Sequence, residues 1–166
     1  MRLEQSVAEG LMKHAYDVAV RESHDPRTKI AALIVQPDGQ IVSQRANQFP
    51  RGVAVMLDRL DAPTKYDYMT HAEEGAVLEL TRLNRSSEGL IMVCPWAACS
   101  NCARDIINAQ LSELIIHQPP MEKTPQHWLE SVAKAHAMLK EAGVTLSILP
   151  GLLGTQMRME QRWIDV

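Results

Sequence analysis

Residues 71–102 read HAEEGAVLELTRLNRSSEGLIMVCPWAACSNC, and this stretch holds a helical pattern, an apolar strand and the start of another helix. Two motifs stand at the two helix starts: His71-Ala72-Glu73 and, after a gap of 25 residues, Cys99-Ser100-Asn101-Cys102. Helix starts beside strand ends are the usual place for ligands in α/β sheets. The stretch therefore predicts an α/β protein whose functional site lies at these two helix starts.

The side chains of these motifs are those of a metal site. Cys99 and Cys102 are three residues apart on a predicted helix and share one face, and a helix N-terminus favours the thiolate that a metal requires. With His71 they offer three nitrogen and sulfur ligands, which is typical of a catalytic Zn²⁺ with an open fourth position. A Cys-x-x-Cys pair alone is also compatible with a structural zinc or a redox pair, but the upstream His-x-Glu favours the catalytic ion.

A carboxylate beside the metal ligands suggests acid/base chemistry, and two glutamates compete for that role. In a regular helix the residue two positions after His71 points nearly away from it, so helical phase favours Glu74. The His-x-Glu pattern favours Glu73 instead. We assign the general acid/base to Glu73 on the motif alone.

The flanking sequence continues the alternation of helix and strand. A helix is predicted over the first twenty-odd residues, ended by Asp25-Pro26, because the residue before proline disfavours helix. The order α-β-β-α-β-α-β-α-β predicts a single α/β domain over residues 1–166, with a five-stranded mixed sheet and helices on both faces. Strands are expected at 30–35, 41–46, 90–94, 114–117 and 144–149, and further helices at 72–83, at 99–109 and from Thr124-Pro125 to Gly143.

Between the second strand and His71, residues 47–70 show no periodicity. Loops of this length without structure of their own are uncommon in compact domains and are usually functional or mobile. We expect this loop to contribute to the site that follows it.

Composition excludes several classes of function. The net charge is −3 and no basic cluster is found, which argues against a nucleic-acid partner. The apolar runs are too short to cross a bilayer, and the N-terminal residues lack the apolar core of a signal peptide, so a cytoplasmic location is expected. Three cysteines, two of them in one motif, fit metal binding in a reducing compartment better than a disulfide framework.

Longer motifs in the same order resemble the deoxycytidylate (dCMP) deaminase family of the zinc-dependent cytidine deaminase superfamily, over nearly the whole chain. The family patterns are S-x-D-P-x-T-K, N-G-F-P-R-G, K-Y-x-Y/W leading into H-A-E, and C-x-x-C-A-R/K. The matching segments are SHDPRTK (23–29), NQFPRG (47–52), KYDYMTHAEE (65–74) and CSNCAR (99–104). Several matched motifs are far more specific than one Cys-x-x-Cys.

The resemblance implies a function for the catalytic set. His71, Cys99 and Cys102 would hold Zn²⁺, which activates water for attack on C4 of cytosine. Glu73 would move the proton of that water to N3 and then assist the departing ammonia. The implied reaction is the hydrolytic deamination of dCMP to dUMP and ammonia.

The resemblance also implies substrate contacts. Asn47 would hydrogen-bond the sugar hydroxyl, and Arg51 would hold the 5′-phosphate, with Arg27 or Lys29 as alternatives. Trp96 would pack against the base, and Ala72, beside Glu73, joins the substrate-binding set. The expected partners are a small-molecule nucleotide and further copies of this chain in a homo-oligomer, with no nucleic acid and no membrane.

Departures from the family pattern limit the interpretation. Ala98 stands where the family usually has proline, and Gly75 replaces its asparagine. The family's G-Y-N-G, linked to an allosteric nucleotide, reads RANQ at 45–48, so we expect weak or absent activation by dCTP. Deamination of a related base or nucleotide (modified dCMP, dCTP, cytidine or guanine) is the alternative, followed by a non-catalytic zinc-stabilised binding module.

Overall fold

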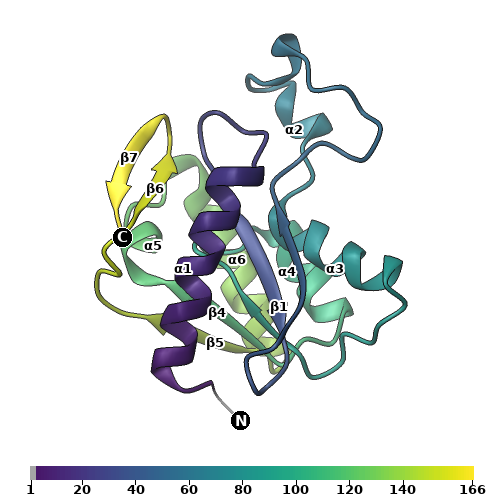
Figure 1. The fold of residues 1–166 in the computed structure, drawn as a ribbon, viewed down its shortest axis with the longest axis vertical. Coiled ribbons are helices and arrows are strands. Elements are labelled where there is room, and N and C mark those ends of the chain that lie inside the picture. The colour runs from purple at the N-terminus through teal and green to yellow at the C-terminus, as the bar shows by residue number, and fades with distance from the viewer. Residues whose placement is uncertain (1–2) are drawn as a thin grey trace.

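The expected lack of a signal-peptide core rests partly on Met1 and Arg2, which lie outside residues 3–166, the part of the chain that the computed structural model describes. Its centre is one five-stranded sheet in the order β2-β1-β3-β4-β5 (Figure 1). β1 pairs antiparallel with β2 and β3, whereas β3–β4 and β4–β5 are parallel, so the predicted mixed sheet is confirmed. The strands are β1 (Ala31–Val35), β2 (Ile41–Ala46), β3 (Ile91–Val93), β4 (Glu113–His117) and β5 (Thr145–Leu149).

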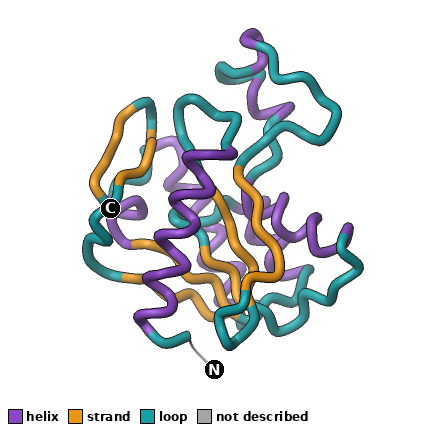
Figure 2. The backbone as a smooth tube through the Cα atoms, in the orientation of Figure 1, coloured by secondary structure: helices purple, strands orange, loops and turns teal. Residues whose placement is uncertain are grey.

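Helices cover both faces of this sheet, as the sequence predicts. The helix α1 lies across one face, and α3, α4 and α6 pack on the other (Figures 1 and 2). The three central strands β1, β3 and β4 are buried along their whole length, because helices cover them on both sides. The four helices are α1 (Gln5–Glu22), α3 (Ala72–Arg82), α4 (Ser100–Asn108) and α6 (Gln126–Glu141).

The predicted loop at 47–70 forms an arm that projects from one end of the sheet (Figure 1). It holds a 3₁₀ turn, η1 (Leu57–Arg59), and a short helix, α2 (Lys65–Tyr68). Its two ends are joined by backbone hydrogen bonds in both directions between Gln48 and Thr70. The helical turns escaped prediction because three or four residues are too few to show a helical period.

Residues 150–166, for which no element is predicted, contain a β-hairpin of β6 (Gln156–Met159) and β7 (Arg162–Asp165). Two-residue hairpin turns normally carry asparagine or glycine, since both central residues need positive φ. Here Glu160 and Gln161 occupy those positions, with φ of 48° and 67°. These two residues therefore do not predict a hairpin turn.

The start of α6 differs by one residue from the prediction. Pro125 itself is the N-cap, and α6 begins at Gln126 rather than Pro125. The Thr124 hydroxyl, expected to cap the helix, instead accepts a hydrogen bond from the Trp96 indole and donates one to the Met121 carbonyl. The short α5 (Gln118–Glu122), which precedes it, is also absent from the prediction.

Within residues 3–166, none of the helices combines the length and apolar character that crossing a bilayer requires.

The packing of β4 between the helix layers gives a test of the core. Leu114 is 0% exposed, so Leu114→Ala should lower the free energy of unfolding by about 2–5 kcal/mol. Leu152 is 69% exposed, and Leu152→Ala should change it by less than about 0.5 kcal/mol. Urea denaturation measures both values, and equal losses would contradict this placement of the core.

Candidate active site

Two helix N-termini bring the predicted metal ligands together. His71 is the N-cap residue of α3, Cys99 is the N-cap residue of α4, and Cys102 lies in the first turn of α4. An N-cap side chain usually accepts a backbone hydrogen bond of its own helix. Within the described chain neither His71 nor Cys99 does so, and both side chains instead turn toward Cys102.

The three side chains have the spacing of ligands to one metal ion. The His71 Nδ1 atom lies 3.3 Å from Cys102 Sγ and 3.6 Å from Cys99 Sγ, and the two sulfurs are 3.5 Å apart. Tetrahedral zinc, with bonds of about 2.3 Å to sulfur and about 2.1 Å to nitrogen, separates its ligands by about 3.6–3.8 Å. The observed separations are close to these values, so the cluster is compatible with a metal site.

Electrostatics within the cluster favour a bound cation. Hydrogen bonding with Cys102, and then with His71, lowers the pKa of Cys99 to about 4. The hydrogen bond with Cys99 raises the pKa of His71 to about 9. The protein groups alone thus pair a thiolate with a protonated imidazole, and a metal cation can take the place of that proton.

Glu73, rather than Glu74, faces the cluster. Glu73 is 6% exposed and lines the same pocket as His71 and Cys99. Glu74 is half-buried and does not line this pocket. The helical-phase argument fails because His71 precedes the helix, with extended backbone angles of φ −66° and ψ 154°. Burial raises the pKa of the Glu73 carboxyl, which favours its holding a proton.

Aromatic side chains form one wall of this pocket. Trp96 lines it and is held by a hydrogen bond of 2.9 Å from its indole nitrogen to Thr124 Oγ1. Trp128, from the first turn of α6, makes edge-to-face contacts with both Trp96 and His71, with ring centroids 6.2 Å apart in each pair. Tyr66 of α2 makes a further edge-to-face contact with Trp128.

Asn47 lines the pocket and organises the segment that precedes β1. It is 7% exposed, and its Oδ1 atom accepts hydrogen bonds from Ser23 Oγ and the Ile30 amide. Its Nδ2 atom donates to the Thr28 carbonyl. An amide nitrogen carries two hydrogens, so Nδ2 keeps one further donor. Ala72 also lines the pocket.

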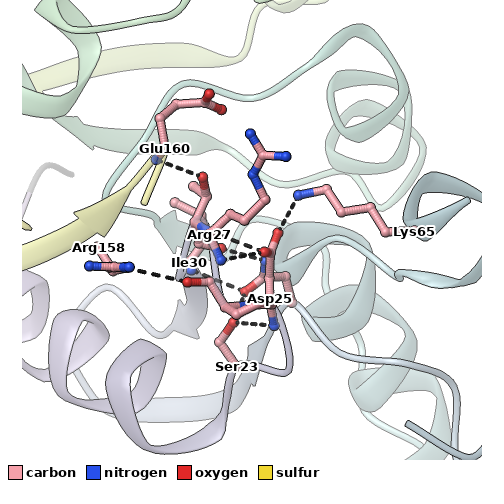
Figure 3. Close-up of polar contacts among 10 residues, drawn as sticks. Ser23, Asp25, Arg27, Ile30, Lys65, Arg158 and Glu160 are labelled. Atoms are coloured by element: carbon pink, nitrogen blue, oxygen red, sulfur yellow. Dashed lines mark hydrogen bonds and ion pairs between the residues drawn. The ribbon is translucent and has the colours of Figure 1, made fainter. Parts of the chain in front are cut away.

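A buried ion pair lies at the part of the pocket lined by Asp25, Thr28, Lys65 and Glu160, which is called its mouth below. The Asp25 carboxylate accepts a hydrogen bond from Lys65 Nζ at 2.7 Å, and their side chains are 4% and 9% exposed (Figure 3). The other oxygen of Asp25 accepts the backbone N–H groups of Arg27 and Thr28. The pair therefore ties the segment before β1 to the arm.

Arg51 lies in a different depression from the other predicted site residues. Its Nη2 atom donates to Glu79 of α3 at 2.8 Å, and the depression also contains Arg45 and Arg82. None of the cluster residues lines it. The phosphate contact expected of Arg51 is therefore not formed in the pocket of its own chain, and its role stays a prediction, as does the weak response to dCTP.

Three features of the pocket escaped the sequence prediction. Trp128 occurs in a segment without any motif, and nothing in the sequence links it to His71. Asp25 and Lys65 both fall within motifs that we quoted, but their pairing requires the tertiary structure. Glu160, which lines the mouth, lies in a hairpin turn that has no compositional signal.

Comparison with known proteins places this site in a family. The family described as the cytidine and deoxycytidylate deaminase zinc-binding region matches residues 5–118, and the chain belongs to it. The chain is 32% identical, over 77% of its length and 84% of the relative's, to a protein of Aliivibrio fischeri described as an uncharacterized deaminase in the luxG 3′ region. It is 29% identical to the deoxycytidylate deaminase of Mus musculus, over 77% of this chain and 71% of that one.

A solved structure agrees with the fold. The dCMP deaminase of the cyanophage S-TIM5, in complex with dCMP and dUMP, superposes with a TM-score of 0.71 over 89% of this chain and 99% of that chain. The sequence identity is 20%, so the likeness establishes the fold. Family and fold together make this chain a deaminase-type enzyme.

The position of Glu73 yields a test against Glu74. Glu73→Gln should reduce deamination by roughly 10²–10⁴-fold, because an amide cannot relay protons. Glu74→Gln removes the same charge one residue away and should stay active. Initial rates, followed by the absorbance change when the amine is lost, decide between them, and the reverse pattern would make Glu74 the acid/base.

Proposed function

We propose that this protein is a zinc-dependent deaminase that hydrolyses dCMP to dUMP and ammonia. The observation that carries the proposal is the convergence of His71, Cys99 and Cys102 on one point, with the Glu73 carboxyl on the same pocket. A purely structural zinc would need no buried acid beside it. The family membership supports the same reaction class.

His71, Cys99 and Cys102 would hold the zinc ion through one nitrogen and two sulfur atoms. The ion would supply a nucleophilic water at neutral pH, because zinc lowers the pKa of coordinated water to about 7. Two helix N-termini at the cluster favour the thiolate form of the cysteines. His71 and Cys99 both line the pocket, so an ion held there would supply its chemistry to a ligand in the pocket.

Glu73 would move the protons of the reaction. Its raised pKa suits a group that takes a proton at neutral pH and then gives it to the N3 atom of the cytosine ring. The same carboxyl would then assist the leaving amine at C4. Burial keeps bulk water from competing for this proton.

The aromatic wall would orient the base. Trp96 and Trp128 present apolar ring surface to the pocket, and the bond from Trp96 to Thr124 fixes one of the rings. Asn47 would donate its remaining Nδ2 hydrogen to a sugar hydroxyl, and Ala72 would bring backbone close to the base edge. With the base held at Glu73, the 5′ side of the nucleotide extends toward the mouth.

A cation near that mouth would hold the 5′-phosphate. Arg27 extends on the same side of the loop as Lys65 and Glu160 (Figure 3), and its backbone is fixed by the bond to Asp25. Lys65 is already paired with Asp25. Neither Arg27 nor Arg51 lines the pocket itself. We propose Arg27, on the segment next to the lining residues Asp25 and Thr28, as the alternative to Arg51, whose guanidinium pairs with Glu79.

We also propose a homo-oligomer in the cytoplasm. Exposed apolar side chains occur on the arm, at Val55, Met56 and Leu57, and on α3 at Leu78. Such exposed apolar groups are typical of association surfaces. Thiol ligands persist best in a reducing compartment.

Metal content tests the cluster. We expect about one tightly bound zinc per chain in the purified protein, since three side chains converge on a single point. The double substitution Cys99→Ala and Cys102→Ala should abolish binding, whereas Cys94→Ala, which removes a buried thiol outside the cluster, should retain it. Elemental analysis provides the measurement. Full zinc content in the double variant would place the ion elsewhere.

Substrate preference tests the phosphate site. We expect dCMP to be deaminated in preference to deoxycytidine, and Arg27→Ala to raise KM for dCMP by roughly tenfold or more, the worth of a charge-assisted hydrogen bond. Arg51→Ala should leave the preference in place. Initial rates of the zinc-loaded protein on cytidine, deoxycytidine, dCMP, dCTP, methylated dCMP and guanine provide the data. Equal turnover of nucleoside and nucleotide would refute the phosphate site, and loss of preference in Arg51→Ala alone would assign the phosphate to Arg51.

A further inference from the structure

The β6–β7 hairpin is fastened to the segment that forms the mouth of the pocket. The Lys29 amide donates to the Arg158 carbonyl at 2.9 Å, and the Gln161 amide donates to the Arg27 carbonyl at 2.8 Å. The Glu160 amide donates to Thr28 Oγ1 at 3.1 Å (Figure 3). Met157 and Met159 of β6 are buried in the main hydrophobic core. The hairpin is thus a fixed part of the pocket, although the family match ends at residue 118.

The tip of this hairpin is held in an unfavourable conformation. Glu160 and Gln161 both have positive φ, which side-chain-bearing residues rarely adopt. An Asn-Gly pair would fit such a turn with less strain. Strain of this kind is found where the surrounding contacts enforce it, often at functional sites.

The tip places the Glu160 carboxylate at the mouth of the pocket. Glu160 lines the pocket together with Asp25, Thr28 and Lys65. Figure 3 shows its side chain extending on the same side of the loop as those of Arg27 and Lys65. Within residues 3–166, neither the Glu160 carboxylate nor the Arg27 guanidinium forms a side-chain hydrogen bond or ion pair.

The charges at the mouth therefore fall into two groups. Asp25 and Lys65 form a closed pair that is neutral overall. Among Asp25, Lys65 and Glu160, which line the mouth, Glu160 alone makes no side-chain hydrogen bond or ion pair in the described part of the chain. Arg27, Lys29 and Arg158 lie on the adjoining segments and not in the pocket lining. Arg27 attracts an anionic substituent, and Glu160 repels it, so the mouth has little capacity for additional negative charge.

We propose that Glu160 is a specificity-determining residue that limits the negative charge of the substrate at the mouth of the pocket. This inference rests on the proposed function, which directs the base to Glu73 and the 5′ substituent to the mouth. One phosphate is held by Arg27. Lys65 is already paired with Asp25. Each further phosphate would meet the Glu160 carboxylate, so a triphosphate is disfavoured over a monophosphate.

Equilibrium binding of product-like ligands tests this without turnover. Calorimetry would measure the Kd of deoxyuridine, dUMP and dUTP for the wild-type protein and for Glu160→Gln. We expect the affinity for dUMP, relative to deoxyuridine, to rise on the order of fivefold, and that for dUTP to rise more, since the repulsion grows with ligand charge. Added salt should shrink both differences.

Two further variants separate charge from structure. Asp165→Asn removes a carboxylate from the same hairpin at a position bonded to Gln156, and it should leave the relative affinities unchanged. Glu160→Asn removes the same charge and introduces a residue that tolerates positive φ. It should change the relative affinities as Glu160→Gln does, even where Glu160→Gln perturbs the turn.

The outcomes distinguish this inference from the proposed function. If Glu160→Gln and Glu160→Asn raise the Kd of deoxyuridine, dUMP and dUTP by the same factor, Glu160 contacts the sugar or base, and the charge limit is overturned. Unchanged relative affinities, or no binding of any ligand, would also overturn it. Failure of the zinc-loaded wild-type protein to deaminate any cytosine compound would refute the proposed function, whatever the binding series shows.

Discussion

The site depends on the use of two helix N-termini as ligand positions. His71 and Cys99 occupy the N-caps of α3 and α4, where a side chain would ordinarily satisfy a backbone N–H group. The positive ends of two helix dipoles thus meet beside a place for a cation, which would be unfavourable without compensating negative charge. Deprotonated Cys99 and Cys102 would supply that compensation. A cation bound by His71, Cys99 and Cys102 would therefore also hold the two helices in their relative positions.

Much of the frame follows from sequence pattern because its elements are long and uniformly buried or amphipathic. The strands at 31–35 and 113–117 and the helices α1 and α6 carry a clear period, and their order limits the sheet to few arrangements. The grouping of His71 with Cys99 and Cys102 follows because both motifs stand at helix starts next to the same sheet. The motif assigns the acid/base to Glu73, and Glu73 rather than Glu74 lines the pocket because His71 is extended, not helical.

The mouth of the pocket was much less predictable, because each of its contacts joins segments that are distant in sequence. Asp25 meets Lys65 across 40 residues, and Trp128 meets His71 through a packing contact that no local pattern encodes. The turn at Glu160 lacks the residues that normally announce a hairpin. Most of the pocket's residues lie within the matched family segment, but Trp128 and Val132 of α6 and Glu160 of the hairpin turn come from the part of the chain after it.

The distance along the chain between the two halves of the mouth also bears on the order of folding. Thr28 and Glu160 are hydrogen-bonded across 132 residues, and the entropy lost in closing a chain segment grows with its length. That cost falls once the intervening sheet has formed, because folded strands bring the two ends near each other. The hairpin therefore gains its stability only from a body that already exists. We therefore expect the hairpin to open locally at a lower free energy than the buried strands β3 and β4.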